Sequence, residues 1–318
     1  MKFATIGHLL IEENIELFPK TWIKENLILS PEMNINGIKG FITCLSLTAQ
    51  QMMGLPRDVV RLKILDTARY VQNELGVDLI QLGALTTSVT NGGKWLTEQK
   101  SYSGFVNHGD SYTAAVTCQA VFKILKLLDK NSSDLVLSIV GAYGVIGEAV
   151  SKILVPHFAH SILIGRNEKK LNKLTSYLQG SYETTKNLKT KNAEIIVTAT
   201  SHPEALLNSE HLKKNAIIVD VSQPPNLSYD VCKKRPDIRR IDGGYVDFPS
   251  KIQIPGLPIG KNFACIVEVI MQALENEKEN HVGSIDLVYL QKTEKWAQRY
   301  GFMLNELTNF GKALQMIV

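Results

Sequence analysis

The chain has 318 residues, of which 44% are hydrophobic and 21% charged, and its 35 basic and 31 acidic residues give a formal net charge of +4. This length suits about two domains, and the composition is typical of a globular protein rather than a disordered or fibrous one. Because the basic residues are spread along the chain, no basic stripe is available to follow a phosphate backbone. Nucleic acid is therefore not expected as a partner.

The segments that most resemble targeting signals are too polar to be a signal peptide or too short to span a membrane. Residues 1–8 carry one lysine and a short apolar run, and acidic residues follow, which is not the pattern of a signal peptide. The stretch Leu135–Gly147 is too short to span a bilayer and contains three glycines. The four cysteines lack paired spacing, and no His/Cys cluster has metal-ligand spacing. We expect a soluble cytoplasmic protein with reduced thiols, no integral membrane segment and no metal.

The first hundred residues mix strand-like and helical patterns, as in an α/β domain. A helix is predicted over Arg57–Leu75, because apolar residues recur there about every three positions and form one face. A second helix is predicted over Ser111–Leu128, before a polar break at residues 129–134. The apolar face of the first helix consists of Val59, Leu62, Leu65, Ala68 and Val71. The predicted strands are Phe3–Ile6, Gly37–Leu47 and Leu79–Leu85.

From residue 134 onward, strand-length and helix-length segments alternate, which predicts βαβ units and a parallel sheet. The residues 224–258 are rich in proline and glycine and are predicted to be mostly loop. The predicted strands of this part are Leu135–Val140, Ser161–Ile164, Glu194–Thr198 and Ala216–Val219. The predicted helices are Val145–Val155, Lys169–Leu178, Asn262–Leu274, Ile285–Tyr300 and Phe302–Met316.

A glycine-rich turn joins the strand at residues 136–140 to the following helix. It reads Gly141, Ala142, Tyr143, Gly144, Val145, Ile146 and Gly147, a GxxGxxG spacing rather than GxGxxG. Glycines between a strand and a helix allow the main chain to approach a pyrophosphate, whose charge the helix N-terminus stabilises. Such turns also occur for packing alone, so the motif needs a second feature before it indicates a dinucleotide site.

The second feature stands about 20 residues further on, where the next strand ends in Arg166-Asn167. A site for NAD places an acidic residue there to bind the ribose 2′-hydroxyl, whereas an arginine suits the 2′-phosphate of NADP. The alternative is a solvated arginine at the start of a helix. The glycine turn and Arg166 together predict a Rossmann site for NADP(H), with Asn167 beside it.

Cys265 lies near the predicted start of a helix. If Asn262 is the N-cap, Cys265 is the third helical residue, and the helix dipole with Lys261 would lower the pKa of its thiol. That arrangement predicts a nucleophile. The alternative is a small hydrophobic residue packed with its apolar neighbours. Cys44 and Cys118 are expected in the core, and Cys232 at an exposed helix end.

Several segments across most of the chain together resemble one family, the long-chain acyl-[acyl-carrier-protein] reductases. These enzymes use NADPH to convert fatty acyl thioesters into fatty aldehydes. In that family the cysteine of a Phe-Ala-Cys segment carries the acyl group as a thioester, and Cys265 stands in its place. The segments are residues 3–9, 75–78, 82–83, 109–114, 141–147, 166–167, 218–220, 243–244 and 263–265 with Glu268.

The resemblance implies attack of Cys265 on an acyl thioester and hydride transfer from NADPH. The implied partners are an acyl-carrier protein or a CoA thioester, and an enzyme that consumes the aldehyde. His8 is a candidate proton donor or a hydrogen-bonding residue of its strand, and Tyr112, Thr113 and Lys261 are candidates for substrate contacts. The alternative for Tyr112 and Thr113 is helix capping. Tyr112 stands where the family has histidine, and the loop 248–258 is shorter than the corresponding loop of the family. The family's acyl chain length and carrier are therefore not assigned to this chain.

The expected fold class is α/β, with a parallel-sheet Rossmann domain and a second α/β substrate domain. The substrate domain is expected over residues 1–130, and the NADP-binding domain over 131–279 with the Cys265 helix at its end. Residues 280–318 are expected to be helices that pack back on the first domain. Two other functions stay open: a shikimate-dehydrogenase-like oxidoreductase acting on a small hydroxy acid without a covalent intermediate, and a non-catalytic NADP-binding module.

Overall fold

The computed structural model describes residues 1–25, 27–250 and 252–314, which form two compact units. The first unit comprises residues 1–112, 247–284 and 292–303. The second unit comprises residues 113–246 and 285–291, together with the C-terminal segment from 304. This division differs from the expected boundaries, because the Cys265 helix belongs to the first unit and not to the end of the NADP-binding domain.

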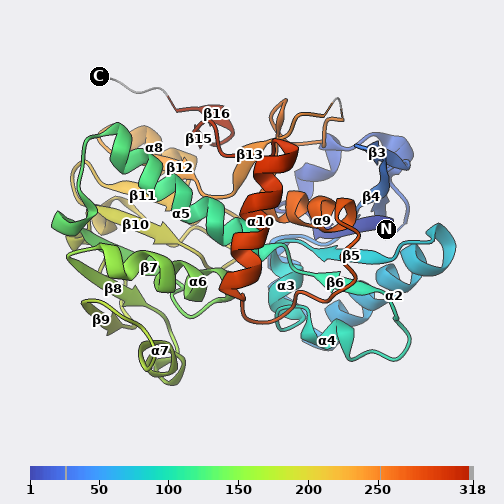
Figure 1. Cartoon of the computed structure of the whole chain (residues 1–318), viewed down its shortest axis with the longest axis horizontal. Helices are drawn as coiled ribbons and strands as arrows, with labels where there is room; N and C mark the ends of the chain where they lie inside the picture. The colour runs from blue at the N-terminus through green and yellow to red at the C-terminus, as the bar shows by residue number, and fades with distance from the viewer. Residues whose placement is uncertain (26, 251, 315–318) are drawn as a thin grey trace. The chain divides into compact units, whose positions relative to one another are not determined.

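The first unit is built on a mixed sheet in the order β2-β4-β1-β5-β6, with β3 also paired to β4 (Figure 1). The strands β4, β1, β5 and β6 are parallel, while β2 and β3 run antiparallel to β4. All four residues of β5 are buried, as a parallel strand covered on both faces requires. The bounds are β1 Phe3–His8, β2 Leu27–Leu29, β3 Met33–Ile35, β4 Ile38–Leu45, β5 Leu79–Leu82 and β6 Phe105–Asn107.

Helix α9, Ala264–Leu274, packs against β5, β1 and β4 of this sheet. Helix α2 has the predicted bounds Arg57–Leu75, and Leu65, Ala68 and Val71 of its predicted apolar face are buried. Val59 and Leu62 are exposed, and Val60 and Ile64 are buried in their place, because a 3.6-residue period places the core stripe there. The short helices are η1 Glu12–Leu17, η2 Lys20–Trp22, α1 Ala49–Gly54, α3 Leu85–Val89 and α4 Lys94–Thr97.

The second unit is built on a parallel sheet in the order β12-β11-β10-β7-β8-β9 (Figure 1). If the strands are numbered along the chain with β7 as the first, the order across the sheet is 6-5-4-1-2-3. From the opposite edge this is 3-2-1-4-5-6, the order of a doubly wound dinucleotide-binding sheet. The α/β expectation with a parallel sheet is therefore confirmed. The bounds are β7 Val136–Val140, β8 His160–Ile164, β9 Tyr182–Thr185, β10 Ile195–Thr198, β11 Ile217–Asp220 and β12 Arg239–Asp242.

The helices of the second unit follow its strands, and α6 packs against β7. Two helices, α5 and α10, are divided between the units. The bounds are α5 Asp110–Leu127, α6 Val145–Leu154, α7 Glu168–Thr175, α8 Tyr229–Lys234 and α10 Leu287–Tyr300. The single-turn helices are η3 Ser132–Asp134, η4 Val155–His157, η5 Thr190–Asn192 and η6 Ser209–His211.

The prediction of a helix over Phe302–Met316 is wrong. The strands β15 Thr308–Asn309 and β16 Lys312–Ala313 form a hairpin there, and residues 315 and 316 of that prediction lie outside the described residues. The buried Asp242 carboxylate accepts from Thr308 Oγ1 (2.8 Å) and from the main-chain N–H of Gly311 (2.8 Å), which holds the hairpin to the unit. A further strand pair joins β13 Tyr245–Asp247 to β14 Lys261–Phe263.

Across the described part of the chain, no helix combines the length and the apolar character needed to cross a bilayer.

Candidate functional site

The glycine turn of the second unit lies between β7 and α6, with Gly144 as the N-cap residue of the helix. Gly141 has a φ of 88°, and a Cβ on it would lie 2.3 Å from the carbonyl oxygen of Ala199, directly after β10. A Cβ on Gly147 would lie 2.1 Å from the carbonyl oxygen of Gly141. Main chain therefore packs on main chain at this turn, which requires glycine at both positions.

This turn fits a dinucleotide pyrophosphate. It stands at the carboxyl ends of the adjacent strands β7 and β10, where the strand order reverses and such ligands bind in doubly wound sheets. No side chain caps the N-terminus of α6, so the positive end of its dipole is not neutralised by a capping oxygen. Ala142, Val145 and Ile146 complete the turn and the first helical residues.

The structure brings Tyr143 of the glycine turn to the end of β8. A Cβ on Gly165 would lie 2.3 Å from Tyr143 Cε1, so the aromatic ring occupies the space that a side chain would fill. The main-chain N–H of Asn167 donates to the Tyr143 hydroxyl (3.1 Å), and Asn167 Oδ1 caps α7 by accepting from the Lys170 N–H (3.0 Å). Arg166 is exposed and makes no hydrogen bond or ion pair with any described residue. Its guanidinium is available to a ligand.

Cys265 lies in the first turn of α9, but one position earlier than predicted. Phe263 is the N-cap, so Cys265 is the second helical residue. Asn262 belongs to β14, and its Oδ1 accepts from the N–H of Phe263 (2.8 Å). A Cβ on Gly109 would lie 2.4 Å from the Cys265 carbonyl oxygen and 2.6 Å from its Cβ. The main chain between β6 and α5 therefore packs directly on Cys265.

The prediction that the Cys265 thiol has a lowered pKa is wrong. Burial raises its pKa to about 12, with further contributions from the carboxyl groups of Asp110 and Glu268. The main-chain hydrogen bonds at the helix start act in the opposite direction but are smaller. At this helix start, desolvation and two acidic neighbours outweigh the helix dipole.

The acidic neighbours belong to a buried polar cluster. Glu268 Oε2 accepts from the Tyr112 N–H (2.7 Å), and burial together with the Glu268 charge holds the pKa of Asp110 well above its usual range. His108 Nδ1 accepts from the Asp110 N–H (3.0 Å), and burial, with the nearby His281, lowers the pKa of His108 to about 3. At neutral pH, His108 is therefore a neutral imidazole.

Lys261 does not act on the thiol as predicted. Its Nζ pairs with Asp247 Oδ1 at 2.6 Å, and its side chain is mostly buried. Lys261 does not contribute to the shifted pKa of Cys265. A carboxylate thus engages the cation that was expected to stabilise the thiolate.

His8 is buried at the end of β1, and both of its ring nitrogens meet main-chain groups. Nδ1 lies 2.7 Å from the Leu9 carbonyl oxygen, and Nε2 accepts from the Leu85 N–H (3.2 Å). Because Nε2 accepts, the proton lies on Nδ1. Burial lowers the pKa of His8. This favours the hydrogen-bonding role of His8 over the proton-donor role.

Tyr112 and Thr113 are placed in different units by the division after residue 112. The Tyr112 ring is buried, and its hydroxyl donates to the Phe302 carbonyl oxygen. The Thr113 carbonyl oxygen accepts from Thr117 Oγ1 (2.8 Å). Neither residue caps α5, whose described bounds begin at Asp110.

The sequence contained a signal for the carboxyl groups near Cys265 that was not used. In α9, Glu268 and Gln272 are polar residues, four positions apart, in an otherwise apolar helix, and both are fully buried. A buried polar residue at i+3 from a candidate nucleophile indicates a functional environment. Asp110 gave no such signal, because it approaches Cys265 only through the fold.

Residues 124–242 match the family model described as shikimate / quinate 5-dehydrogenase. Over 315 residues, the chain is 26% identical to the aminotransferase PigE of Serratia sp., covering 92% of this chain. It spans only 36% of the length of that relative. Over 259 residues, it is 25% identical to a long-chain acyl-[acyl-carrier-protein] reductase of Synechococcus elongatus, covering 76% of this chain and 75% of the relative.

Solved structures that match this chain have low sequence identity to it and low TM-scores. The L-tryptophan dehydrogenase of Nostoc punctiforme is 13% identical, with a TM-score of 0.44 over 95% of this chain and 80% of that one. The shikimate dehydrogenase of Aquifex aeolicus is 12% identical, with a TM-score of 0.41 over 93% of this chain and 97% of that one. From its own sheet order, its glycine turn and the matched family, the second unit is an NADP(H)-binding Rossmann domain of the oxidoreductase type.

Proposed function

We propose that the chain reduces a fatty acyl thioester to an aldehyde, with NADPH as the reductant and Cys265 as the residue that carries the acyl group. The carrying observation is the position of Cys265 in the first turn of α9, where the main-chain N–H groups at the helix start are candidates to stabilise an oxyanion. The similarity to the acyl reductase of Synechococcus elongatus supports this proposal.

In the first step the Cys265 sulfur attacks the thioester carbonyl carbon, and the bond from that carbon to the carrier sulfur breaks. The thiol proton of Cys265 leaves with the carrier thiol, so the exchange needs no net proton. A covalent thioester divides one difficult reaction into two easier ones. NADPH, when bound, supplies the hydride that converts the enzyme thioester into the aldehyde. The Cys265 sulfur departs as a thiolate and takes a proton from water.

The raised pKa of Cys265 is compatible with this scheme. A thiol that stays protonated until the acyl group arrives is protected from alkylation and oxidation in the resting protein.

The residues that would hold NADPH are the turn from Gly141 to Gly147 for the pyrophosphate, and Arg166 with Asn167 for the 2′-phosphate. The turn supplies main-chain N–H groups, and Arg166 supplies a cation without a partner among the described residues. The acyl donor would be an acyl-carrier protein or CoA, and an aldehyde-consuming enzyme would follow. The four cysteines form no disulfide in the described part of the chain, which supports a cytoplasmic site of action.

The second candidate function is a shikimate-dehydrogenase-like oxidation of a small hydroxy acid, without a covalent intermediate. The match of residues 124–242 to the shikimate / quinate 5-dehydrogenase model favours it. In that case Cys265 would be a packing residue. A non-catalytic NADP-binding module is the third possibility.

One experiment separates these functions. The protein is incubated with acyl-CoA or acyl-carrier protein of several chain lengths, without NADPH, and its intact mass is measured. We expect an added acyl group that is absent in Cys265→Ser and present in Cys232→Ser, a half-buried cysteine of the second unit that serves as the matched control. Addition of NADPH should then remove the adduct and release aldehyde.

The absence of an adduct at every chain length would exclude the covalent mechanism. Oxidation of a hydroxy acid that survives Cys265→Ser would establish the second function instead. Binding of NADPH without turnover of either substrate class would leave the non-catalytic module.

A further inference from the structure

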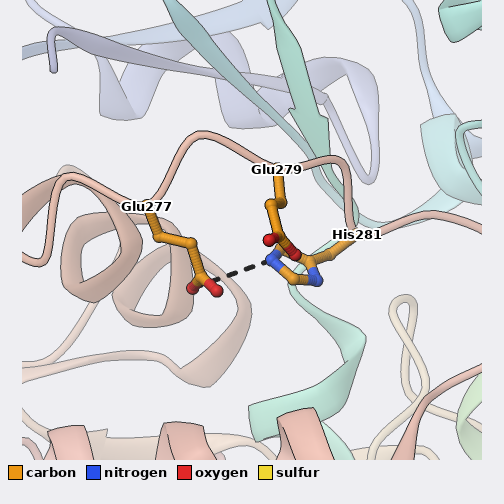
Figure 2. A group of neighbouring side chains, drawn as sticks. All are labelled: Glu277, Glu279 and His281. Carbon is orange, nitrogen blue, oxygen red and sulfur yellow. Dashed lines mark ion pairs between the residues drawn. The ribbon is translucent and has the colours of Figure 1, made fainter.

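Three side chains that follow α9 converge on one point of the first unit, outside the Cys265 cluster. Glu277, Glu279 and His281 each offer one ligand atom, and these atoms all lie within 4.8 Å of one another. Figure 2 shows the two carboxylates and the imidazole directed toward a common position. The three residues alternate along the chain, and alternation places side chains on one side of an extended segment.

The main chain of this segment is held in place from the interior. Gln272 is fully buried on α9, and its Nε2 donates to the carbonyl oxygens of both Glu277 (3.0 Å) and Glu279 (2.8 Å). Its Oε1 in turn accepts from Asn107 Nδ2 at the end of β6 (2.8 Å). The N–H of His281 donates to the Val106 carbonyl oxygen (2.9 Å). The main-chain positions of the three residues are therefore set by a buried network.

One carboxylate oxygen in the group needs a partner. Lys292 pairs with Glu277 Oε1, whereas Glu277 Oε2 is buried and accepts no hydrogen bond from the described residues. That oxygen faces the imidazole, 3.8 Å from His281 Nε2. A buried carboxylate oxygen without a donor is costly, and a cation at this point would satisfy it.

We propose that Glu277, Glu279 and His281 bind one divalent transition-metal ion, with Zn²⁺ as the best-suited metal. One imidazole nitrogen and two carboxylate oxygens are ligands that Zn²⁺ accepts, at about 2.0–2.2 Å, with water in the fourth position. In a tetrahedral site two such ligand atoms lie about 3.4 Å apart, so the side chains would close by at most about 1.4 Å to reach the ion. The imidazole favours a transition metal over Mg²⁺ or Ca²⁺, which prefer oxygen ligands.

The role of this ion would be structural. His281 forms a β-bridge with Asn107 at the end of β6, and the His281 carbonyl oxygen accepts from the N–H of His108 (3.1 Å). His108 stands two residues before Asp110, a neighbour of Cys265. An ion that joins His281 to Glu277 would fix the segment 277–281 against α9 and β6. The site does not depend on the proposed reductase activity, because none of its ligands contacts Cys265 in that scheme.

The test uses the full chain, stripped of metal with a chelator and titrated calorimetrically with ZnCl₂. We expect one ion per chain, and a weakening of at least about tenfold in both Glu279→Gln and His281→Gln. Glu279 is exposed, so its substitution leaves packing intact. Zn²⁺ should also raise the unfolding temperature of the parent chain and much less that of the two variants. Glu183→Gln, an exposed glutamate of β9, is the matched control and should behave as the parent.

A titration with CoCl₂ distinguishes this site from the cysteines, since thiolate ligands give an intense near-ultraviolet band that a His/Glu site lacks. The expected spectrum has visible ligand-field bands only, and these disappear in His281→Gln. Absence of saturable binding would overturn the proposal. So would binding of equal strength in the parent, Glu279→Gln and His281→Gln, or a thiolate band as the only spectral change.

Discussion

The glycine turn of the second unit and the Cys265 cluster of the first both use a helix N-terminus, but they are assembled differently. The turn is made by consecutive residues between β7 and α6, and glycines allow its main chain to pack tightly. The Cys265 cluster joins residues 108–112 to α9, more than 150 positions away along the chain. Local sequence is enough to build the first site, and only the fold builds the second.

The two helix starts also differ in charge. No side chain caps α6, and the exposed Arg166 stands at the end of the neighbouring strand β8, so an anion is favoured there. At α9, the carboxyl groups of Asp110 and Glu268 and the loss of solvent raise the pKa of the thiol. A helix dipole contributes only a modest stabilisation near its end, and burial with nearby charge decides the result.

The largest expected effect concerns the reactivity of Cys265. With a pKa of about 12 in place of 9.0, the thiolate fraction at pH 8 is about a thousandfold lower than for an ordinary thiol. Iodoacetamide labelling of Cys265, followed by peptide mass spectrometry, should accelerate tenfold per pH unit with no plateau near pH 9. Because the folded thiol binds its proton more tightly, the reactivity rises only toward alkaline pH.

Glu268→Gln sharpens this prediction, because its side-chain oxygen can still accept from Tyr112 while the charge is lost. We expect a lower pKa for Cys265 and faster labelling at a given pH. A plateau near pH 9 in the parent protein would mean that the thiol ionises with an ordinary pKa, which would contradict the raised value.

The next effect concerns the turn. Gly147→Ala would place a Cβ 2.1 Å from the Gly141 carbonyl oxygen and push α6 away from the turn. We expect NADPH affinity, measured by fluorescence titration, to fall by about a hundredfold, since ligand amides displaced by an ångström lose most of their binding. The control is Gly54→Ala, whose added Cβ would meet no atom within 4 Å. Unchanged NADPH binding in Gly147→Ala would contradict the proposed pyrophosphate site.

The packing of Gly109 on Cys265 gives a third prediction. Gly109 and Gly260 have nearly the same positive φ, 71° and 73°, but a Cβ on Gly109 meets Cys265 while one on Gly260 meets nothing within 4 Å. Both alanine variants carry the backbone penalty of about 1 kcal/mol, and Gly109→Ala adds an overpacking cost of about 1–3 kcal/mol. Urea unfolding should show this difference, and equal midpoints would mean that the contact relaxes freely.

The smallest effect concerns the choice of cofactor. Arg166→Ala should weaken NADPH binding about tenfold, equivalent to about 1.4 kcal/mol, and leave NADH binding nearly unchanged. Arg69→Ala, an exposed arginine of the first unit, is the control. Equal losses for both nucleotides in Arg166→Ala would place the 2′-phosphate elsewhere.

Much of the fold follows from local patterns. The bounds of α2 were predicted to the residue, and the strand, glycine turn and helix at residues 136–154 appear where the pattern predicts them. The errors have physical causes. The apolar residues after Phe302 do not form a helix, because Asp242 and its neighbours bind that segment as a hairpin. Cys265 is one position closer to the helix start, because Asn262 belongs to a strand.

Sequence alone determined the nucleotide-binding half, because a strand, a glycine turn, a helix and Arg166 lie within about thirty consecutive residues, and the turn acts through its own main chain. It also singled out Cys265 as the residue of interest. Only the tertiary structure decided the chemical state of that cysteine, because the charge and burial around it come from Asp110 and the loop at Gly109, distant in sequence. The same holds for Glu277, Glu279 and His281, whose common orientation depends on the buried amide of Gln272.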